Sequence, residues 1–182
     1  MKTNFCKALC AVVLLTAAAM AAKTPVVGGH KMYANKNIVE NAVNSADHTT
    51  LVAAVKAAGL VETLEGPGPF TVFAPTNEAF AKLPAGTVDT LLKPENKATL
   101  IKVLTYHVVA GKWSAADLKR QIKAGHGRAE LKTVSGGTLT ASLMRGHIML
   151  KDEKGGSAMV TIPNVFQSNG VIHVVNAVLL PN

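Results

Sequence analysis

Two apolar segments about a hundred residues apart constrain the fold of this chain more than any other feature. Residues 70–80 read Phe-Thr-Val-Phe-Ala-Pro-Thr-Asn-Glu-Ala-Phe, which is typical of a short strand, a proline corner and a helix start. Residues 170–181 read Gly-Val-Ile-His-Val-Val-Asn-Ala-Val-Leu-Leu-Pro, and such a run is typical of a strand buried on both faces. Because a chain of this size normally builds one core, we expect the two segments to share it.

The first 22 residues have the composition of a secretory signal. Lys2 and Lys7 accompany an apolar stretch at residues 8–19, and small residues at positions 19–22 suit cleavage. The apolar stretch is shorter than the ~20 residues that span a bilayer, which argues against a permanent anchor. Cleavage would leave 160 of the 182 residues, one domain without a transmembrane segment, outside the cell or in the periplasm.

Residue types that carry catalysis are missing or badly spaced. Both cysteines, Cys6 and Cys10, lie in the leader, so the mature chain has no thiol for a disulfide, a nucleophile or a metal. The six histidines lack the spacing of zinc ligands, and no nucleophile elbow, phosphate loop or dinucleotide motif is present. The sequence therefore predicts no enzyme, no cofactor and no bound metal.

Positive charge is concentrated between residues 112 and 154, with nine Lys or Arg against four acidic residues. A candidate basic patch for an anionic polysaccharide comprises Lys119, Arg120, Lys123 and Arg128. A solvated helix face would carry the same charges, so that reading stays open. Trp113 is the one aromatic residue nearby, and without interleaved aromatics nucleic acid is not an expected partner.

Helical spacing dominates the first half of the mature chain and strand alternation the second. Apolar residues recur at helical spacing near residues 38–43, 49–58, 79–83 and 100–104, and an amphipathic helix is predicted from Ser114 to Gly125. Gly-rich turns separate predicted strands at 131–134, 139–143, 148–150, 159–162 and 171–180. We expect a flexible lead-in at residues 23–35 and a single α+β domain at residues 36–182.

Two histidines lie where burial is expected. His173 is flanked by Val and Ile, and we expect it to be neutral and hydrogen-bonded across the sheet, since an unpaired buried polar group costs ~1–3 kcal/mol. His107 follows Tyr106 at a predicted helix end, where the helix dipole favours the protonated form. We expect structural pairing for His107 too, with a pH-sensitive contact as the alternative.

Together these segments resemble the fasciclin domain over residues 36–182. Tyr106–His107 is similar to the Tyr-His motif of the family. Residues matching its first and second boxes are Phe73, Pro75, Thr76, Phe80, His173 and Asn176. The resemblance implies a β-sandwich or wedge with several helices packed on one side, and no active site in most members.

The resemblance also implies where partners bind. In animal matrix members, integrin recognition is attributed to the Tyr-His pair and to an Asp-Ile pair before the second box. These positions are Tyr106, His107, Asn164 and Val165, so the carboxylate is missing here. We expect a monomeric adhesion module that contacts a cell-surface protein, a matrix protein or a polysaccharide. The alternative is a carrier of an apolar small molecule such as a pigment or a lipid.

Overall fold

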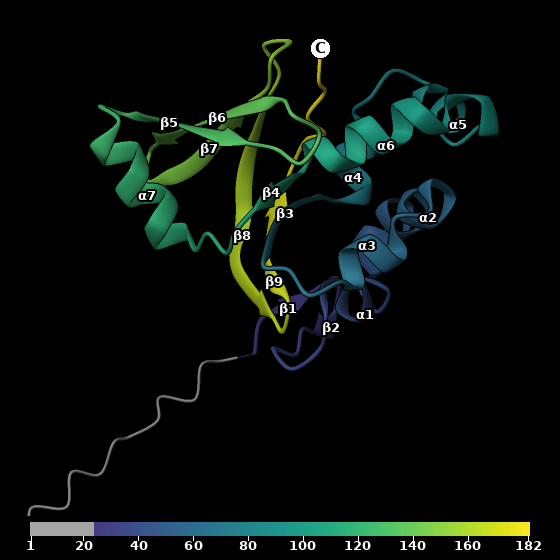
Figure 1. The fold of residues 1–182 in the computed structure, drawn as a ribbon, viewed down its shortest axis with the longest axis horizontal. Coiled ribbons are helices and arrows are strands. Elements are labelled where there is room, and N and C mark those ends of the chain that lie inside the picture. Colours follow the sequence, from purple (N-terminus) through teal and green to yellow (C-terminus); the bar gives the residue numbers. More distant parts are fainter. Residues whose placement is uncertain (1–23) are drawn as a thin grey trace, which may run out of the picture.

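The two apolar segments pair side by side at the centre of the sheet in a computed structural model that describes residues 24–182 (Figure 1). β3 (Phe70–Pro75) and β9 (Gly170–Val175) run parallel, in register from Phe70 opposite Gly170 to Pro75 opposite Val175. Every residue of β9 is buried, as expected for a strand covered on both faces. The expected secretory signal, residues 1–22, lies outside the described residues.

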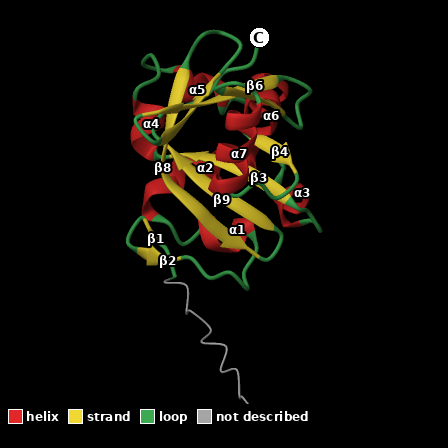
Figure 2. Ribbon diagram, turned by 90° about the vertical axis from the view of Figure 1, so that its left-hand side faces the viewer, coloured by secondary structure: helices red, strands yellow, loops and turns green. Residues whose placement is uncertain are grey.

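The described chain forms a seven-stranded mixed sheet with the order β4-β3-β9-β8-β7-β6-β5 (Figures 1 and 2). Its remaining strands are β4 (Val108–Ala110), β5 (Arg128–Lys132), β6 (Thr138–Met144), β7 (His147–Lys151) and β8 (Ser157–Gln167). β5 to β8 form the antiparallel meander predicted from the Gly-rich turns. A bridge between Val109 and Thr133 joins the two edges, so the curled sheet nearly closes on itself.

Helices lie on both sides of this sheet (Figure 1). On one side are α1 (Ile38–Ala42), α2 (Thr49–Ala58), α3 (Val61–Glu65), α4 (Asn77–Ala81), α5 (Thr87–Leu91) and α6 (Lys97–Tyr106), with short 3-10 helices at Ala46–His48 and Pro94–Asn96. α7 (Ala115–Ala124) packs instead against β5, β6 and β7. The predicted α+β wedge with several helices on one side is confirmed, and α7 adds a cover to the other side.

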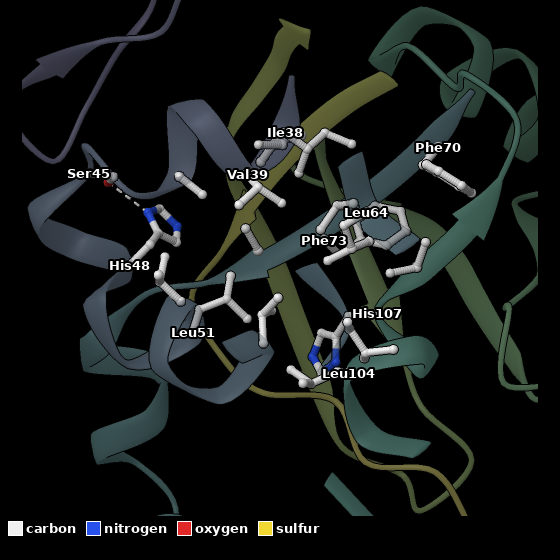
Figure 3. A pocket seen from close by; sticks show the side chains of 18 of the residues that line it. Ile38, Val39, Ser45, His48, Leu51, Leu64, Phe70, Phe73, Leu104 and His107 are labelled. Atoms are coloured by element: carbon white, nitrogen blue, oxygen red, sulfur yellow. Dashed lines mark hydrogen bonds between the residues drawn. The ribbon is translucent and has the colours of Figure 1, made fainter. Parts of the chain in front are cut away.

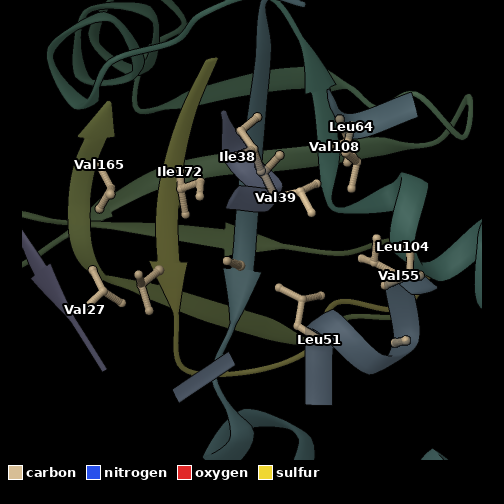
Figure 4. Close-up of a cluster of buried hydrophobic side chains, with 14 of the residues drawn as sticks. Val27, Ile38, Val39, Leu51, Val55, Leu64, Leu104, Val108, Val165 and Ile172 are labelled. Carbon is tan, nitrogen blue, oxygen red and sulfur yellow. The ribbon is translucent and has the colours of Figure 1, made fainter. Parts of the chain in front are cut away.

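The sheet separates two apolar clusters because successive side chains of a strand point to opposite faces. On β3, Val72 and Ala74 belong to the first cluster and Phe73 to the second. The first cluster fills the space under the helices (Figure 4) and includes Ile38, Val39, Leu51, Val55, Leu64, Leu104, Val165 and Ile172. The second cluster lies inside the curled sheet below α7 and includes Tyr106, Leu118, Ile122, Leu139, Leu150, Val160, Val175 and Leu179.

The first box runs from β3 directly into α4. Pro75 is the last residue of β3, and the hydroxyl of Thr76 accepts a hydrogen bond from the backbone N–H of Ala79 at 3.2 Å. This contact satisfies one of the free N–H groups at the helix start. Phe80 then packs into the first cluster. The predicted order of strand, proline corner and helix start is confirmed.

The lead-in is more ordered than expected. Residues 23–35 contain a two-stranded hairpin of β1 (Val26–Val27) and β2 (His30–Lys31). Gly28 and Gly29 supply the positive φ values, 57° and 77°, that its tight turn requires. Val27 and Met32 pack into the first cluster, so from residue 26 onward the lead-in has a hairpin and core contacts that the sequence did not predict.

The last strand is shorter than expected. The prediction extended it from residue 171 to residue 180, whereas β9 ends at Val175. The backbone N–H groups of Leu179 and Leu180 bond to side chains, His107 Nε2 at 3.0 Å and Asp152 Oδ2 at 2.9 Å, and not to a neighbouring strand. Leu179 is still fully buried, which explains why the apolar residues continue beyond the end of β9.

Replacing Phe73 by Ala should lower the free energy of unfolding by about 3–5 kcal/mol, the usual cost of emptying an aromatic core position. Phe73 is fully buried and stacks on His173 with ring centroids 5.7 Å apart. Phe166 on β8 is the matched control, because it is 40% exposed and its replacement should cost about 1 kcal/mol or less. Urea unfolding measures both, and equal losses would contradict this account of the core.

Candidate functional site

His173 is the centre of a buried polar network between β9 and the loop that precedes α7. Its Nδ1 accepts a hydrogen bond from the backbone N–H of Asn164 at 3.3 Å, so Nε2 carries the proton and donates to the carbonyl of Trp113 at 2.8 Å. Burial lowers the pKa of His173, and the Trp113 carbonyl opposes that shift. The expectation of a buried, neutral and paired histidine is confirmed.

Thr71 and Asn164 complete this network. The Thr71 hydroxyl donates to the carbonyl of Gly111 at 2.7 Å and accepts from the backbone N–H of Trp113 at 2.9 Å. Asn164, at a φ of 60°, accepts from the backbone N–H of Ala115 at 2.7 Å. Ala115 is the first residue of α7, so Asn164 satisfies a free N–H group of that helix. The network thus fastens both the loop and the helix to the sheet.

The Tyr-His pair fastens the C-terminal segment in a similar way. His107 Nε2 accepts from the backbone N–H of Leu179, so its Nδ1 donates to the carbonyl of Val103 at 2.9 Å. The Tyr106 hydroxyl donates to the carbonyl of Thr138 at 2.8 Å and accepts from the backbone N–H of Glu153 at 3.2 Å. Burial lowers the pKa of His107 to about 4, although the Val103 carbonyl opposes the shift. His107 is therefore neutral near pH 7.

Three of the four residues expected to contact a partner lie inside the protein. Tyr106, His107 and Val165 expose only 0%, 3% and 1% of their surface. Asn164 is partly exposed, but its side-chain oxygen is already bonded to Ala115. These side chains hold the fold together, so the direct contact implied by the resemblance is not available to the three buried ones.

Other polar residues of the motifs and the turns also support the fold. Asn176 accepts from the backbone N–H of Met159 on β8 at 2.8 Å. Asp152 is buried between two backbone donors, Gly156 N–H at 2.6 Å and Leu180 N–H at 2.9 Å. Across residues 24–182 no group of three or more His, Cys, Asp or Glu could hold a metal ion. Over the same residues no helix combines the length and apolarity needed to cross a membrane.

The predicted basic patch is spread over two elements, with Lys119, Arg120 and Lys123 on α7 and Arg128 at the start of β5. All four of its residues are exposed: Lys119, Arg120, Lys123 and Arg128. Two open hollows adjoin Trp113, one of about 280 Å³ lined by Arg120 and one of about 540 Å³ lined by Arg128 and Lys132. Lys119 and Lys123 line neither hollow. The structure therefore brings Arg120 and Arg128 to one surface and leaves the two lysines outside it.

Trp113 forms a wall shared by both hollows and is held firmly. Its indole N–H donates to the carbonyl of Ala110 at 3.0 Å, while its backbone is bonded to Thr71 and His173. Gln121 and Ala124 of α7 line both hollows beside it. We call this surface the Trp113 surface; it is lined by Trp113, Asp117, Arg120, Gln121, Ala124, Arg128, Glu130 and Lys132. The sequence marked Trp113 only as an isolated aromatic residue, because its neighbours are assembled by the docking of α7.

A second candidate site is an apolar cavity of about 80 Å³ within the first cluster (Figure 3). Val39, Leu51 and Leu104 are among its lining residues, and His48 with Ser45 adds polar groups. Sites for drug-sized ligands usually have volumes of about 300–1,000 Å³. This cavity is therefore too small for the pigment or whole lipid of the alternative function.

Lowering the pH from about 6.5 to about 4 should reduce the free energy of unfolding. The pKa of His107 is about 4 in the folded state and ~6.5 when unfolded, so in this window protons bind the unfolded chain first. This one residue should remove about 3 kcal/mol by pH 4, and His48 and His173, whose pKa values are also lowered, act in the same direction. Urea unfolding at pH 7, 5 and 4 measures the slope.

His107→Gln should flatten this pH dependence, even though it lowers stability at pH 7. His147→Gln is the matched control, because it makes the same substitution at an exposed histidine. A His107→Gln variant with the slope of the wild-type protein would rule out His107 as the group that titrates.

Asn164→Ala should lower the free energy of unfolding by about 1–2 kcal/mol, since it removes the acceptor of the Ala115 N–H and a residue suited to positive φ. Asn164→Asp keeps an acceptor and should retain most of the stability. Asn164→Gly keeps the backbone freedom and loses the acceptor. Hydrogen exchange of the Ala115 amide should be faster in the Ala and Gly variants than in the Asp variant. Equal exchange in all three would contradict the anchoring role.

Comparisons with known proteins agree with this architecture. Residues 46–181 match the Fasciclin domain family. Protein sll1483 of Synechocystis sp. is 52% identical over 144 residues, which cover 79% of this chain and 73% of that protein. Immunogenic protein MPB70 of Mycobacterium bovis is 37% identical over 145 residues, which cover 77% and 66% of the two chains.

Animal proteins share the same domain. Transforming growth factor-beta-induced protein ig-h3 of Sus scrofa is 38% identical over 132 residues, which cover 72% of this chain and 17% of that protein. In the solved FAS1 domain pair of the insect cell adhesion molecule Fasciclin I, the fold is similar with a TM-score of 0.70 and 18% identity. That match covers 80% of this chain and 51% of the solved chain. The chain described here belongs to the fasciclin family.

Proposed function

We propose that this protein is a secreted, non-enzymatic adhesion module that binds an anionic polysaccharide through the Trp113 surface. The observation that carries the proposal is the pair of hollows on either side of Trp113, lined by Arg120 in one and by Arg128 and Lys132 in the other. Family membership supports an adhesive role, since relatives include an insect cell adhesion molecule and a cell surface glycolipoprotein of Mycobacterium bovis.

The chemistry of the Trp113 surface suits a chain of acidic sugars. A guanidinium group presents a planar fork of donors that matches a carboxylate or a sulfate. Arg128 offers such a fork, and Arg120 pairs with the Asp117 carboxylate, so an acidic sugar would share or replace that exposed ion pair. A tryptophan ring held in one orientation offers a flat apolar wall with little entropy left to lose on binding. Gln121 adds an exposed amide between these groups. Since all of them come from one chain, a monomer is sufficient for binding.

Secretion fits the rest of the molecule. The composition of residues 1–22 is that of a secretory signal, and the mature chain would enter an oxidising compartment without any cysteine. The titratable residues with shifted pKa values are engaged in contacts that support the fold. Asp117, for example, has its pKa lowered by the hydroxyl and backbone N–H of Ser114 in the α7 capping box. Cell fractionation tests whether the protein is exported to the periplasm or beyond.

Retention of the purified protein on immobilised alginate should depend on which positive charges are removed. The double variant Arg120→Gln/Arg128→Gln should elute at a clearly lower NaCl concentration than the wild-type protein. Lys119→Gln/Lys123→Gln removes the same net charge from the other flank of α7 and should shift elution much less. The comparison separates a local site from the general attraction of a basic protein.

Trp113→Ala supplies a test that leaves the net charge unchanged. Loss of the aromatic wall should weaken alginate binding about tenfold, which corresponds to ~1.4 kcal/mol. If the two double variants elute together and Trp113→Ala elutes with the wild-type protein, the Trp113 surface is not the binding site. Absence of any retention in the wild-type protein at low salt would rule out anionic polysaccharide as the partner.

A further inference from the structure

The apolar cavity lies between two pairs of helices on the side of the sheet away from α7. α1 packs against α3, and α2 packs against α6. Side chains from all four helices line the cavity, and β3 and β9 form its floor (Figure 3). Representative lining residues are Val39, Leu51, Val55, Leu64, Leu104 and Ile172. The cavity therefore occupies the seam between two packed units, a common place for ligand sites.

One polar group in this wall has no partner. His48 is 3% exposed, and its Nε2 forms no hydrogen bond with any described residue. Its other ring nitrogen, Nδ1, lies 2.8 Å from the hydroxyl oxygen of Ser45. Leaving a buried polar atom unpaired costs ~1–3 kcal/mol, so a molecule that bonded to Nε2 would recover that cost.

The ring of His48 is neutral. Burial lowers the pKa of His48, while the Ala74 backbone and the Asp47 carboxylate oppose the shift. The Ala74 backbone lies close enough to act on the ring but forms no hydrogen bond of normal geometry with Nε2. A neutral imidazole pairs with an uncharged group, and a buried carboxylate without a countercharge would be costly here.

The cavity reaches the protein surface along the seam. Its lining includes residues that reach the surface, namely the partly exposed Val52, Leu60 and Val61 and the exposed Lys56 and Thr63. Figure 3 shows His48 and Phe70 at opposite ends of the lining, which gives the site an elongated shape. A small molecule can therefore enter between the helix pairs while the sheet stays intact.

We infer that this cavity binds a small uncharged aliphatic molecule whose single carbonyl or hydroxyl group forms a hydrogen bond with His48 Nε2. The volume of about 80 Å³ sets the size of the molecule. An apolar cavity of about 150 Å³ accommodates the six carbons of benzene, so the enclosed part of this site takes roughly three or four carbons, and the rest of a six-carbon chain extends along the open seam. Alcohols and ketones of about six carbons meet both limits. The site is independent of the Trp113 surface, which shares none of its lining residues.

A titration of the wild-type protein with 1-hexanol tests the inference by methyl NMR. Saturable shifts are expected for methyl groups of Val39, Leu51 and Val55, which line the cavity. Methyl groups of Leu118 and Ile122 in the second cluster are the internal control and should stay in place. Hexanoate at pH 7 has the same chain length with a charge, and it should bind at least tenfold more weakly.

Two variants and one control examine the site itself. His48→Leu removes the polar partner and should weaken 1-hexanol binding three- to tenfold. Val55→Phe fills the cavity and should abolish the saturable shifts. Val43→Phe adds the same bulk at an exposed position outside the lining and should bind like the wild-type protein.

The deciding measurement is the 1-hexanol titration of the wild-type protein, so it does not depend on whether a variant folds. If 1-hexanol causes no saturable shift of the cavity methyl groups in the wild-type protein, the inference is wrong. If 1-hexanol and hexanoate bind equally, or if folded His48→Leu keeps the full affinity, His48 is not the polar partner. Alginate retention should be the same with and without 1-hexanol, so failure of one proposal leaves the other standing.

Discussion

The parallel pairing of β3 with β9 is the constraint on which the rest of the structure depends. It places two strands from distant parts of the chain at the centre of the sheet and stacks Phe73 on His173. Because the residues of each strand alternate between faces, the same pair of strands separates the two apolar clusters. Thr71 and His173 also reach the loop before α7, so this pairing positions the Trp113 surface as well.

Local signals were sufficient for much of the fold. The strand and helix start around Thr76, the helix that follows Ser114 and the burial of His173 follow from residue types and spacing alone. β4 was missed because three residues directly after a helix offer no alternation to recognise. The hairpin in the lead-in was not predicted either, because the Gly28–Gly29 pair gives no sign that Val27 and Met32 pack into the core.

The candidate site was harder to predict, because it depends on how distant elements dock. Helical periodicity already puts Lys119 and Arg120 on different flanks of α7, since successive residues are about 100° apart. Which flank faces Trp113 is decided only when α7 packs on β5, β6 and β7. The Tyr106–His107 pair shows the same limit. The sequence suggested that this motif contacts a partner, whereas in the structure His107 accepts a hydrogen bond from the backbone of Leu179 and Tyr106 donates one to the backbone of Thr138.

The position of β9 has a consequence for how the protein matures. β9 comes after every other strand in the sequence, yet it lies between β3 and β8 in the sheet. Until residues 170–175 leave the ribosome, the strands β4-β3 and β8-β7-β6-β5 therefore lack the central strand between them, and the bridge from Val109 to Thr133 is their remaining strand-to-strand link. Non-local pairing of this kind is slow to form. The interior of the domain is therefore completed only when the last strand of the sequence is in place.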